Sequence, residues 1–400
     1  MDISRVNYIS KSEILNQIIL LRVDLNLPLI DGKVTDTLRI DRLLPTINLL
    51  INNNCKVVLI SHFGRPEGRK IKDYSLYKIL ETLRVNLGIS SIQFSSDCVG
   101  NNALNAVNQT KFGGVCLLEN LRYYKEEELD DENFAKRLSE IADIYVNDAF
   151  SCCHRNHASI VGIPKYLPSF AGLGLENEIK MISQALEKPK RPLLIIIGGS
   201  KISTKLNTIH NIVKKADIVA IGGAMANTFL ASKNIEIGNS LFEKNMINDA
   251  KKILKIAQEN NCEILLPSDF MVANNIKEGN KAQEFDIKKI PKNKMILDIG
   301  NESISNIINK LRRSHSVVWN GPLGAFEYSP FDLSTKKISN EIAKLTLENK
   351  ITSLAGGGDT IAALNQANNA NYFSYLSTAG GAFLEWLEGK ELPGILALKK

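Results

Sequence analysis

The sequence of 400 residues lacks any long apolar segment, since its longest purely apolar run is the five-residue stretch Leu193–Ile197. A membrane-spanning helix needs about 20 such residues, so we expect none. The first residues, Met1–Arg5, are not continuously apolar and do not read as a secretory signal. These absences predict a cytoplasmic protein without a membrane partner.

Cysteine is scarce, with six residues and no Cys-x-x-Cys spacing, so a disulfide framework is not expected. The hexapeptide Cys152–His157 contains four potential zinc ligands. Four ligands from so short a segment cannot surround a tetrahedral ion. The sequence therefore predicts no structural zinc site.

Several familiar signatures are absent as well. The sequence has no G-x-x-x-x-G-K-[ST], which excludes a Walker-type ATPase. It has no G-x-G-x-x-G with a later acidic residue, which argues against a dinucleotide-dependent dehydrogenase. It also has no G-x-S-x-G or H-E-x-x-H, the motifs of serine hydrolases and zinc proteases.

Net charge is small, because 49 basic residues stand against 43 acidic ones and leave +6. The basic residues form no stripe or tail, which argues against a nucleic-acid partner. The arginines, however, are unevenly placed: ten of the 13 lie in the first 155 residues, where an even spread would place about five. Because the guanidinium fork suits carboxylate and phosphate groups, this distribution predicts an anion site in the first part of the chain.

Short apolar strands alternate with segments of helical spacing along the whole chain. This alternation is typical of parallel β-sheets covered by helices on both faces. The expected strands are 18–23, 56–60, 115–118, 144–146, 193–197, 218–221, 264–266, 316–319 and 372–376. The helical segments include 37–52, 74–87, 132–141, 175–187 and 249–259. The last helix before the apolar strand 193–197 stops at two prolines, Pro189 and Pro192, so a helix is expected to join two α/β domains of similar size.

The two halves of the chain differ in the residues that come directly after their strands, where ligands bind in such sheets. In the first half the strand ends lead to Asp24, Asn26 and Arg39, to His62 and Arg65, to Arg122 and to Arg155. Four arginines and a histidine at one edge would repel one another unless an anion lies among them. The first half is therefore predicted to bind a polyanion.

In the second half the strands end in glycine turns at 198–201, 222–224, 356–360 and 380–382. Glycine lets the backbone approach a ligand, and helix N-termini attract phosphate. Lys201 and Lys205 would add mobile charge, and Asp359 stands where Mg²⁺ could bridge phosphate oxygens. A polyanion on one domain and a nucleoside phosphate on the other predict phosphoryl transfer.

The chain resembles the phosphoglycerate kinases over its whole length. The motifs that carry the resemblance are RVDLNLP (22–28), SHFGRP (61–66), LENLR (118–122), DAF (148–150), HRNHAS (154–159), GGSK (198–201), WNGPLGAFE (319–327), GGGDT (356–360) and LEGKELPG (387–394).

The resemblance implies reversible transfer of the acyl phosphate of 1,3-bisphosphoglycerate to Mg-ADP, giving 3-phosphoglycerate and ATP in glycolysis. It implies an α/β fold of two Rossmann-like lobes with parallel sheets flanked by helices. The expected parts are a glycerate lobe (1–170), a linking helix and hinge (171–190), a nucleotide lobe (191–378) and a C-terminal segment that returns to the first lobe (379–400). A monomer that closes about the hinge is expected.

The resemblance also implies the site residues. Those expected to hold the glycerate substrate are Asp24, Leu25, Asn26, Arg39, His62, Phe63, Gly64, Arg65, Arg122 and Arg155. Those expected to hold the nucleotide are Lys201, Lys205, Gly324, Glu327, Gly357, Gly358, Asp359 and Thr360, with Glu327 at the ribose and Asp359 as the Mg²⁺ ligand. Those expected to act on the transferring group are Arg39, Lys201, Gly357 and Gly380.

Two other interpretations stay open at the level of sequence. Another acyl-phosphate or carboxylate kinase would share the same pattern of cations and glycine turns. A non-catalytic basic nucleic-acid-binding protein would show steeply salt-dependent binding and no ATP turnover.

Overall fold

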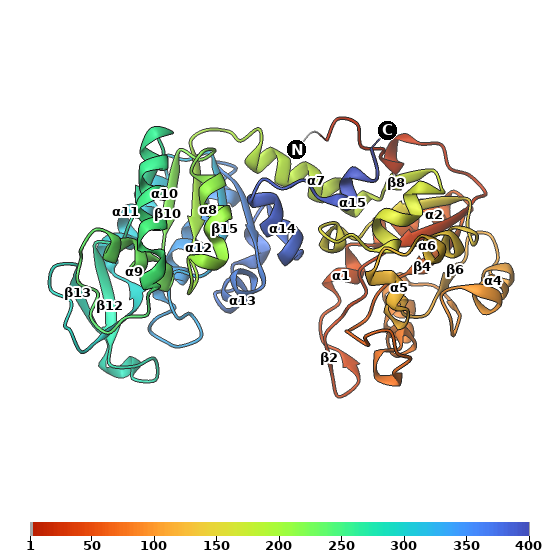
Figure 1. The fold of residues 1–400 in the computed structure, drawn as a ribbon, viewed down its shortest axis with the longest axis horizontal. Coiled ribbons are helices and arrows are strands. Elements are labelled where there is room, and N and C mark those ends of the chain that lie inside the picture. The colour runs from red at the N-terminus through yellow and green to blue at the C-terminus, as the bar shows by residue number, and fades with distance from the viewer. Residues whose placement is uncertain (1–2, 400) are drawn as a thin grey trace. The chain divides into compact units, whose positions relative to one another are not determined.

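The computed structural model describes residues 3–399 and divides into two compact units (Figure 1). Unit 1 comprises Met1–Ile179 and Glu391–Lys400, and unit 2 comprises Lys180–Lys390. Within residues 3–399, no helix combines the length and apolarity needed to cross a membrane.

Unit 1 is built on a six-stranded sheet in the order β5-β6-β4-β1-β7-β8, and all of its pairs are parallel. The central strands are almost entirely buried, as near-continuous apolar runs require. The strands are β1 (Ile18–Arg22), β4 (Lys56–Ile60), β5 (Gln93–Phe94), β6 (Val115–Leu117), β7 (Ile144–Asn147) and β8 (Ser169–Ala171). The helices are α1 (Leu38–Asp41), α2 (Leu44–Asn52), α3 (Leu80–Leu87), α4 (Gly100–Gln109), α5 (Lys125–Glu128), α6 (Glu132–Ser139) and α15 (Pro393–Leu396), and β2 (Leu29–Ile30) pairs with β3 (Lys33–Val34).

Unit 2 has a second six-stranded parallel sheet, in the order β11-β10-β9-β15-β16-β17. Its strands are β9 (Leu193–Ile197), β10 (Ile218–Ile221), β11 (Glu263–Leu265), β15 (Ser316–Asn320), β16 (Thr352–Gly356) and β17 (Tyr375–Ser377). An antiparallel sheet of β13 (Gln283–Asp286), β12 (Asp269–Ala273) and β14 (Met295–Ile299) is added to it. The helices are α8 (Leu206–Ile212), α9 (Gly223–Ser232), α10 (Ile247–Glu259), α11 (Asn301–Leu311), α12 (Leu333–Leu347), α13 (Gly358–Gln366) and α14 (Gly380–Leu387). The predicted class of two parallel α/β lobes is confirmed.

Some elements differ from the sequence-based expectation. The segment 37–52 is two helices, α1 and α2, because Pro45 lacks the N–H that a helix interior needs and is placed instead in the first turn of α2. Strand β16 is additional to the expected strands, since Thr352–Gly356 has one large apolar residue and ends in glycine. The expected strand 372–376 begins only at Tyr375, because Ala370–Tyr372 forms a 3₁₀ turn.

Helix α7 (Leu173–Leu186) runs across the boundary between the two units. Its first turn is fixed within unit 1 by the buried carboxylate of Asp148, which accepts hydrogen bonds from Leu175 N (2.7 Å) and Thr46 Oγ1 (2.5 Å). Burial raises the pKa of Asp148 to about 6, although these hydrogen bonds favour its charged form. The first turn of α7 is thus anchored by one side chain that follows β7.

The C-terminal segment that belongs to unit 1 is shorter than the expected 379–400. Only Glu391–Lys400 groups with unit 1, where Gly394 N donates to Cys153 O at 2.9 Å (Figure 1). Helix α14 stays in unit 2 because it packs on α8, and Asn211 Nδ2 donates to Leu387 O at 2.6 Å. The chain therefore passes from unit 2 to unit 1 after α14.

Replacing the anchor of α7 is expected to destabilise unit 1. In Asp148→Ala, the hydroxyl of Thr46 and the amide of Leu175 lose a buried partner, which costs about 1–3 kcal/mol. Urea unfolding followed by circular dichroism measures this loss. The exposed Glu140→Ala at the end of α6 is the control and should change stability by less than about 0.5 kcal/mol. Equal stability of both variants would contradict the anchoring role.

Candidate functional site

Polar groups at the carboxyl edge of the unit 1 sheet form one connected network. Arg39, in α1, lies 3.2 Å from the carboxylate of Asp24 and donates to the carbonyl of Asn26 at 2.5 Å. The side-chain oxygen of Asn26 accepts from Gly64 N at 2.9 Å. Arg122 Nη1 donates to Gly64 O at 2.8 Å. Groups from four segments are therefore held in place around the ends of β1 and β4.

His62 lies in this network in a defined protonation state. The fully buried Arg22, the last residue of β1, places Nη2 3.2 Å from His62 Nδ1. Because a guanidinium only donates, Nδ1 must accept, so His62 is neutral with its proton on Nε2. Burial lowers the pKa of His62 well below its usual value, and the charges of Arg22, Arg122 and Arg155 lower it further against the opposing effect of Asp24.

The sequence interpretation missed Arg22 and the groups that compensate its charge. Arg22 Nε donates to Ser159 Oγ at 2.9 Å, and Ser159 donates to both oxygens of the fully buried Glu127, at 2.6 Å from Oγ and 2.9 Å from N. Burial raises the pKa of Glu127, while the charge of Arg22 lowers it. Arginine in an otherwise apolar strand was the available signal, since a buried guanidinium needs such partners.

The remaining cations leave an excess of positive charge at this edge. Arg155 and Arg22 both lower the pKa of Arg122, after the larger effect of burial. The carboxylate of Glu128 lies only 3.1 Å from Arg122 Nε and is half exposed. Burial raises the pKa of Asp24, but the charge of Arg39 and the hydrogen bonds from Ser151 Oγ and Asn26 N lower it more, so this carboxylate stays ionised. An incoming anion would meet several oriented N–H donors here.

Three predicted glycerate residues stand apart from this network. Leu25 and Phe63 are buried in the core, and their backbone N–H groups are already bound by Ser61 Oγ (2.9 Å) and Asn120 Oδ1 (3.0 Å). Both residues therefore shape the site rather than offer a donor. Arg65 is exposed and makes no hydrogen bond or ion pair with the residues between 3 and 399, so its guanidinium is available to a ligand.

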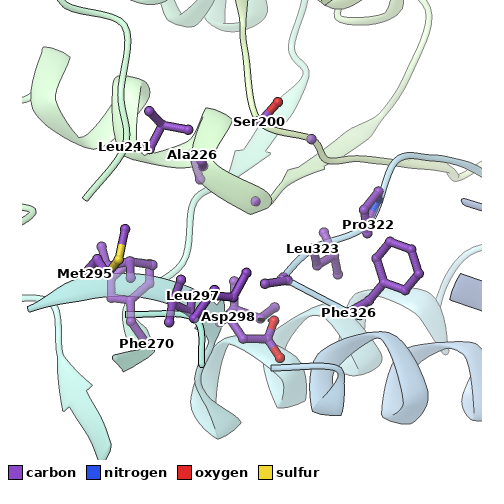
Figure 2. A pocket seen from close by; sticks show the side chains of 18 of the residues that line it. Ser200, Ala226, Leu241, Phe270, Met295, Leu297, Asp298, Pro322, Leu323 and Phe326 are labelled. Carbon is purple, nitrogen blue, oxygen red and sulfur yellow. Dashed lines mark hydrogen bonds between the residues drawn. The ribbon is translucent and has the colours of Figure 1, made fainter. Parts of the chain in front are cut away.

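Unit 2 contains a cavity of about 540 Å³ lined mostly by apolar side chains. Figure 2 shows Ala226 and Leu241 on one side of it and Met295 and Leu297, from β14, on the other. The segment after β15 supplies further lining residues: Pro322, Leu323, Gly324, Ala325, Phe326 and Glu327. A partly open apolar cavity of this size suits a planar heterocycle.

Polar groups gather at one end of this cavity, around the loop 198–201 and the start of α13. Gly198 packs so closely that an added Cβ would lie 1.9 Å from Pro322 O, which only glycine permits. Lys205 Nζ donates to Gly198 O (2.8 Å) and Asn320 O (3.2 Å). Burial lowers the pKa of Lys205 to about 8, against the raising effect of Asp359. Such an arrangement of a glycine-containing loop and an ammonium group can bind phosphate.

Of the other predicted nucleotide residues, some are exposed at the surface and others make hydrogen bonds within the protein. Lys201, Gly358 and Asp359 are exposed, and Gly357 (φ +100°) precedes the first residue of α13. The hydroxyl of Thr360 is already used twice, accepting from Gly321 N (2.7 Å) and donating to Gly356 O (2.9 Å). Thr360 therefore joins two loops. A Cβ on Gly380, the first residue of α14, would meet no atom within 4 Å.

Asn320 is a further residue that the sequence interpretation missed. It is 2% exposed, its Nδ2 donates to Gly356 O at 2.8 Å, and its Oδ1 has no partner among the described residues. Its position at the end of β15 was the signal that could have identified it. A free amide oxygen beside the start of α13, the helix that carries Asp359, fits Mg²⁺, which prefers hard oxygen ligands.

The comparisons with a family model, with protein sequences and with solved structures all lead to the same family. The family model described as phosphoglycerate kinase matches residues 9–390. The chain is 47% identical over 382 residues to the phosphoglycerate kinase of Chelativorans sp. (strain BNC1), covering 96% of each chain. It is 47% identical over 389 residues to that of Rhizobium meliloti (strain 1021), covering 97% of each. The solved phosphoglycerate kinase of Coxiella burnetii is similar with a TM-score of 0.91, 37% identity and 98% coverage of both chains.

The pKa of Lys205 predicts a pH dependence of nucleotide binding. Below pH 8 the ammonium group is charged and attracts phosphate, and above about pH 8 it loses its proton, so ADP affinity should fall by up to about tenfold per pH unit. Isothermal titration calorimetry with ADP from pH 7 to 9.5 measures this change. Lys205→Arg keeps its charge throughout and should remove the pH dependence. A flat profile in the unsubstituted protein would contradict the prediction.

Proposed function

Because the chain belongs to the phosphoglycerate kinase family, we propose that unit 1 binds the glycerate substrate and unit 2 binds the nucleotide. The activity is that of a glycolytic phosphotransferase: the acyl phosphate of 1,3-bisphosphoglycerate passes reversibly to ADP, giving 3-phosphoglycerate and ATP. The observation that supports this division is the separation of an arginine–histidine network in unit 1 from an apolar cavity with a glycine-lined end in unit 2.

In the proposed glycerate site, each cation has a role set by its surroundings. Neutral His62 offers its Nε2–H to a substrate oxygen, because Nδ1 is occupied by Arg22. Arg65, Arg122 and Arg155 supply guanidinium donors for the carboxylate and phosphate groups. The remaining residues assigned to this site are Asp24, Asn26, Arg39 and Gly64, while Leu25 and Phe63 shape it from the core.

In the proposed nucleotide site, the base occupies the apolar cavity and Glu327, at its rim, binds the ribose. The phosphates lie at the loop 198–201, at Lys205 and at the start of α13. Mg²⁺, which the family generally requires, would supply positive charge that offsets the charge of the phosphates. Asp359 and the free oxygen of Asn320 are the residues that would hold it.

Transfer needs no general base, because the acceptor is already an oxyanion of ADP or of the carboxylate. Arg39 comes from unit 1 and Lys201 from unit 2, so the reaction requires a conformation in which the units bring both ligands in line. Arg39 and Lys201 then neutralise charge on the transferring group, aided by the amides of Gly357 and Gly380. Exclusion of water in that conformation protects the acyl phosphate from hydrolysis.

The alternatives drawn from the sequence, another carboxylate kinase or a basic nucleic-acid-binding protein, are not favoured by the family assignment. We extend the proposal to a monomeric, cytoplasmic enzyme without nucleic-acid or membrane partners. The proposed closure involves two units of one chain and needs no partner subunit.

Substitution of either cation at the transferring group tests the proposed function. Removing a preorganised donor of this kind costs about 2.7–4 kcal/mol of barrier, so Arg39→Ala and Lys201→Ala should each lower kcat by roughly a hundredfold or more. A coupled assay of ATP formation from ADP and 1,3-bisphosphoglycerate with Mg²⁺ measures kcat. The exposed Arg313→Ala and Lys233→Ala serve as charge-matched controls. Near-normal turnover in Arg39→Ala or Lys201→Ala would refute the assigned roles.

The metal role of Asp359 is tested by binding rather than by turnover. Asp359→Ala should weaken binding of Mg-ADP by about tenfold and change that of metal-free ADP much less, because the carboxylate acts through the ion. Calorimetry with and without Mg²⁺ separates the two affinities. An unchanged affinity for Mg-ADP would show that Asp359 does not hold the metal.

A further inference from the structure

One short segment of unit 2, Leu241–Glu243, both lines the apolar cavity and binds the loop that contains Lys201. Leu241 lines the apolar cavity and is 53% exposed (Figure 2). Glu243, two residues later, binds the segment that directly follows Lys201. The proposed base site and phosphate site are thus joined by three consecutive residues.

The carboxylate of Glu243 lies at the surface, is partly exposed, and accepts two hydrogen bonds from Ser203. Its Oε1 accepts from Ser203 Oγ at 2.5 Å and its Oε2 accepts from Ser203 N at 2.9 Å. Burial raises the pKa of Glu243, but the hydrogen bonds from Ser203 and Ile202 and the charge of Lys201 outweigh this effect and lower it. The ionised carboxylate therefore holds the backbone immediately after Lys201.

The segment is fixed on its other side by helix α9. Glu243 N donates to Thr228 Oγ1 at 3.1 Å, and Asn227 Nδ2 donates to Leu241 O at 3.0 Å. Asn227 and Thr228 are buried, with 0% and 1% exposure. Glu243 is consequently attached to the rigid core of unit 2, so its bonds to Ser203 transfer that rigidity to the exposed loop.

The loop itself has few other restraints on its exposed side. Lys201, Ser203 and Thr204 are all exposed or partly exposed, and only Ile202 is buried. The remaining side-chain bond in this stretch, from Thr204 Oγ1 to Lys201 O (2.9 Å), is internal to the loop. A loop that must present a lysine to phosphate loses less entropy on binding when it is already ordered.

We propose that Glu243 is a positioning residue for Lys201, and that filling the cavity beside Leu241 orders the phosphate loop through Glu243. The proposal rests on the proposed function, because it requires Lys201 to contact the nucleotide phosphates. It predicts a coupling between base and phosphate binding that runs through residues 241–243.

Whether ADP binding becomes stronger or weaker when Glu243 is replaced distinguishes a positioning role from a purely electrostatic one. If Glu243 acted only as a negative charge near the phosphates, Glu243→Gln would strengthen ADP binding by removing repulsion. If Glu243 positions the loop, Glu243→Gln should weaken it, because a glutamine amide cannot accept from both Ser203 N and Ser203 Oγ in the same geometry. Glu243→Ala, which removes both acceptors, should weaken it further.

The experiment compares binding of ADP, adenosine and inorganic pyrophosphate by calorimetry. In Glu243→Ala the affinities for ADP and pyrophosphate should fall by about tenfold, while adenosine affinity changes by less than about twofold. Saturating adenosine should raise pyrophosphate affinity in the unsubstituted protein and not in Glu243→Ala. In the kinetic assay KM for ADP should rise while KM for the glycerate substrate stays unchanged.

Matched control variants test whether the loss of affinity comes from a general loss of structure. Glu236→Gln, an exposed glutamate a few residues earlier without a partner among residues 3–399, should behave as the unsubstituted protein. Ser203→Ala should reproduce part of the Glu243→Ala effect, because one of the two hydrogen bonds remains. The melting temperature of each variant should stay close to that of the unsubstituted protein.

Stronger ADP binding in Glu243→Gln would overturn the proposal. So would an equal loss of adenosine and ADP affinity in Glu243→Ala, because that result indicates a general structural defect. If Lys201→Ala left ADP affinity unchanged, the assignment of the nucleotide site itself would fail. If Lys201→Ala weakened ADP binding and Glu243→Ala did not, only the positioning role would fail.

Discussion

A partly or fully buried positive charge at the carboxyl edge of each parallel sheet is the feature around which both sites are organised. In unit 1 it is the guanidinium of Arg22, at the end of β1, and in unit 2 it is the ammonium group of Lys205. Burying a charge is costly unless polar partners surround it. Arg22 is compensated through Ser159 and Glu127, whereas Lys205 is bound by the carbonyls of Gly198 and Asn320.

The buried cation of unit 1 determines the chemistry of its neighbours. Because Arg22 donates to His62, the imidazole is neutral and presents a proton on Nε2. The same concentration of cations keeps Asp24 ionised, so that this carboxylate can hold Arg39 in place. The positive field lowers the pKa of both groups, which leaves the carboxyl charged and the imidazole neutral, and both states leave donors directed toward an anion.

Carboxylates that accept backbone N–H groups have the complementary role of fixing segments. Asp148 fixes the start of α7, and Glu243 fixes the loop after Lys201. Asp298, beside the base cavity, accepts from Ser334 N at 3.0 Å, and burial raises its pKa to about 7. In each case the acid is distant in sequence from the segment that it holds. The residues proposed to contact substrate therefore depend on carboxylates that hold the segments around them, of which Asp298 also lines the cavity.

The two parallel α/β lobes, the family and most residues after the strands could be predicted from the amino-acid sequence alone, because apolar runs, glycine turns and ordered motifs are local properties of the chain. The same patterns did not reveal which of those residues face a ligand. Leu25, Phe63 and Thr360 come after strands like the others, yet burial and existing hydrogen bonds occupy them. Arg22, Asn320 and Glu243 gain their importance from partners 40, 36 and 40 residues away. Such pairs exist only in the folded chain, because hydrogen bonds and burial depend on which segments pack together and not on their spacing along the sequence.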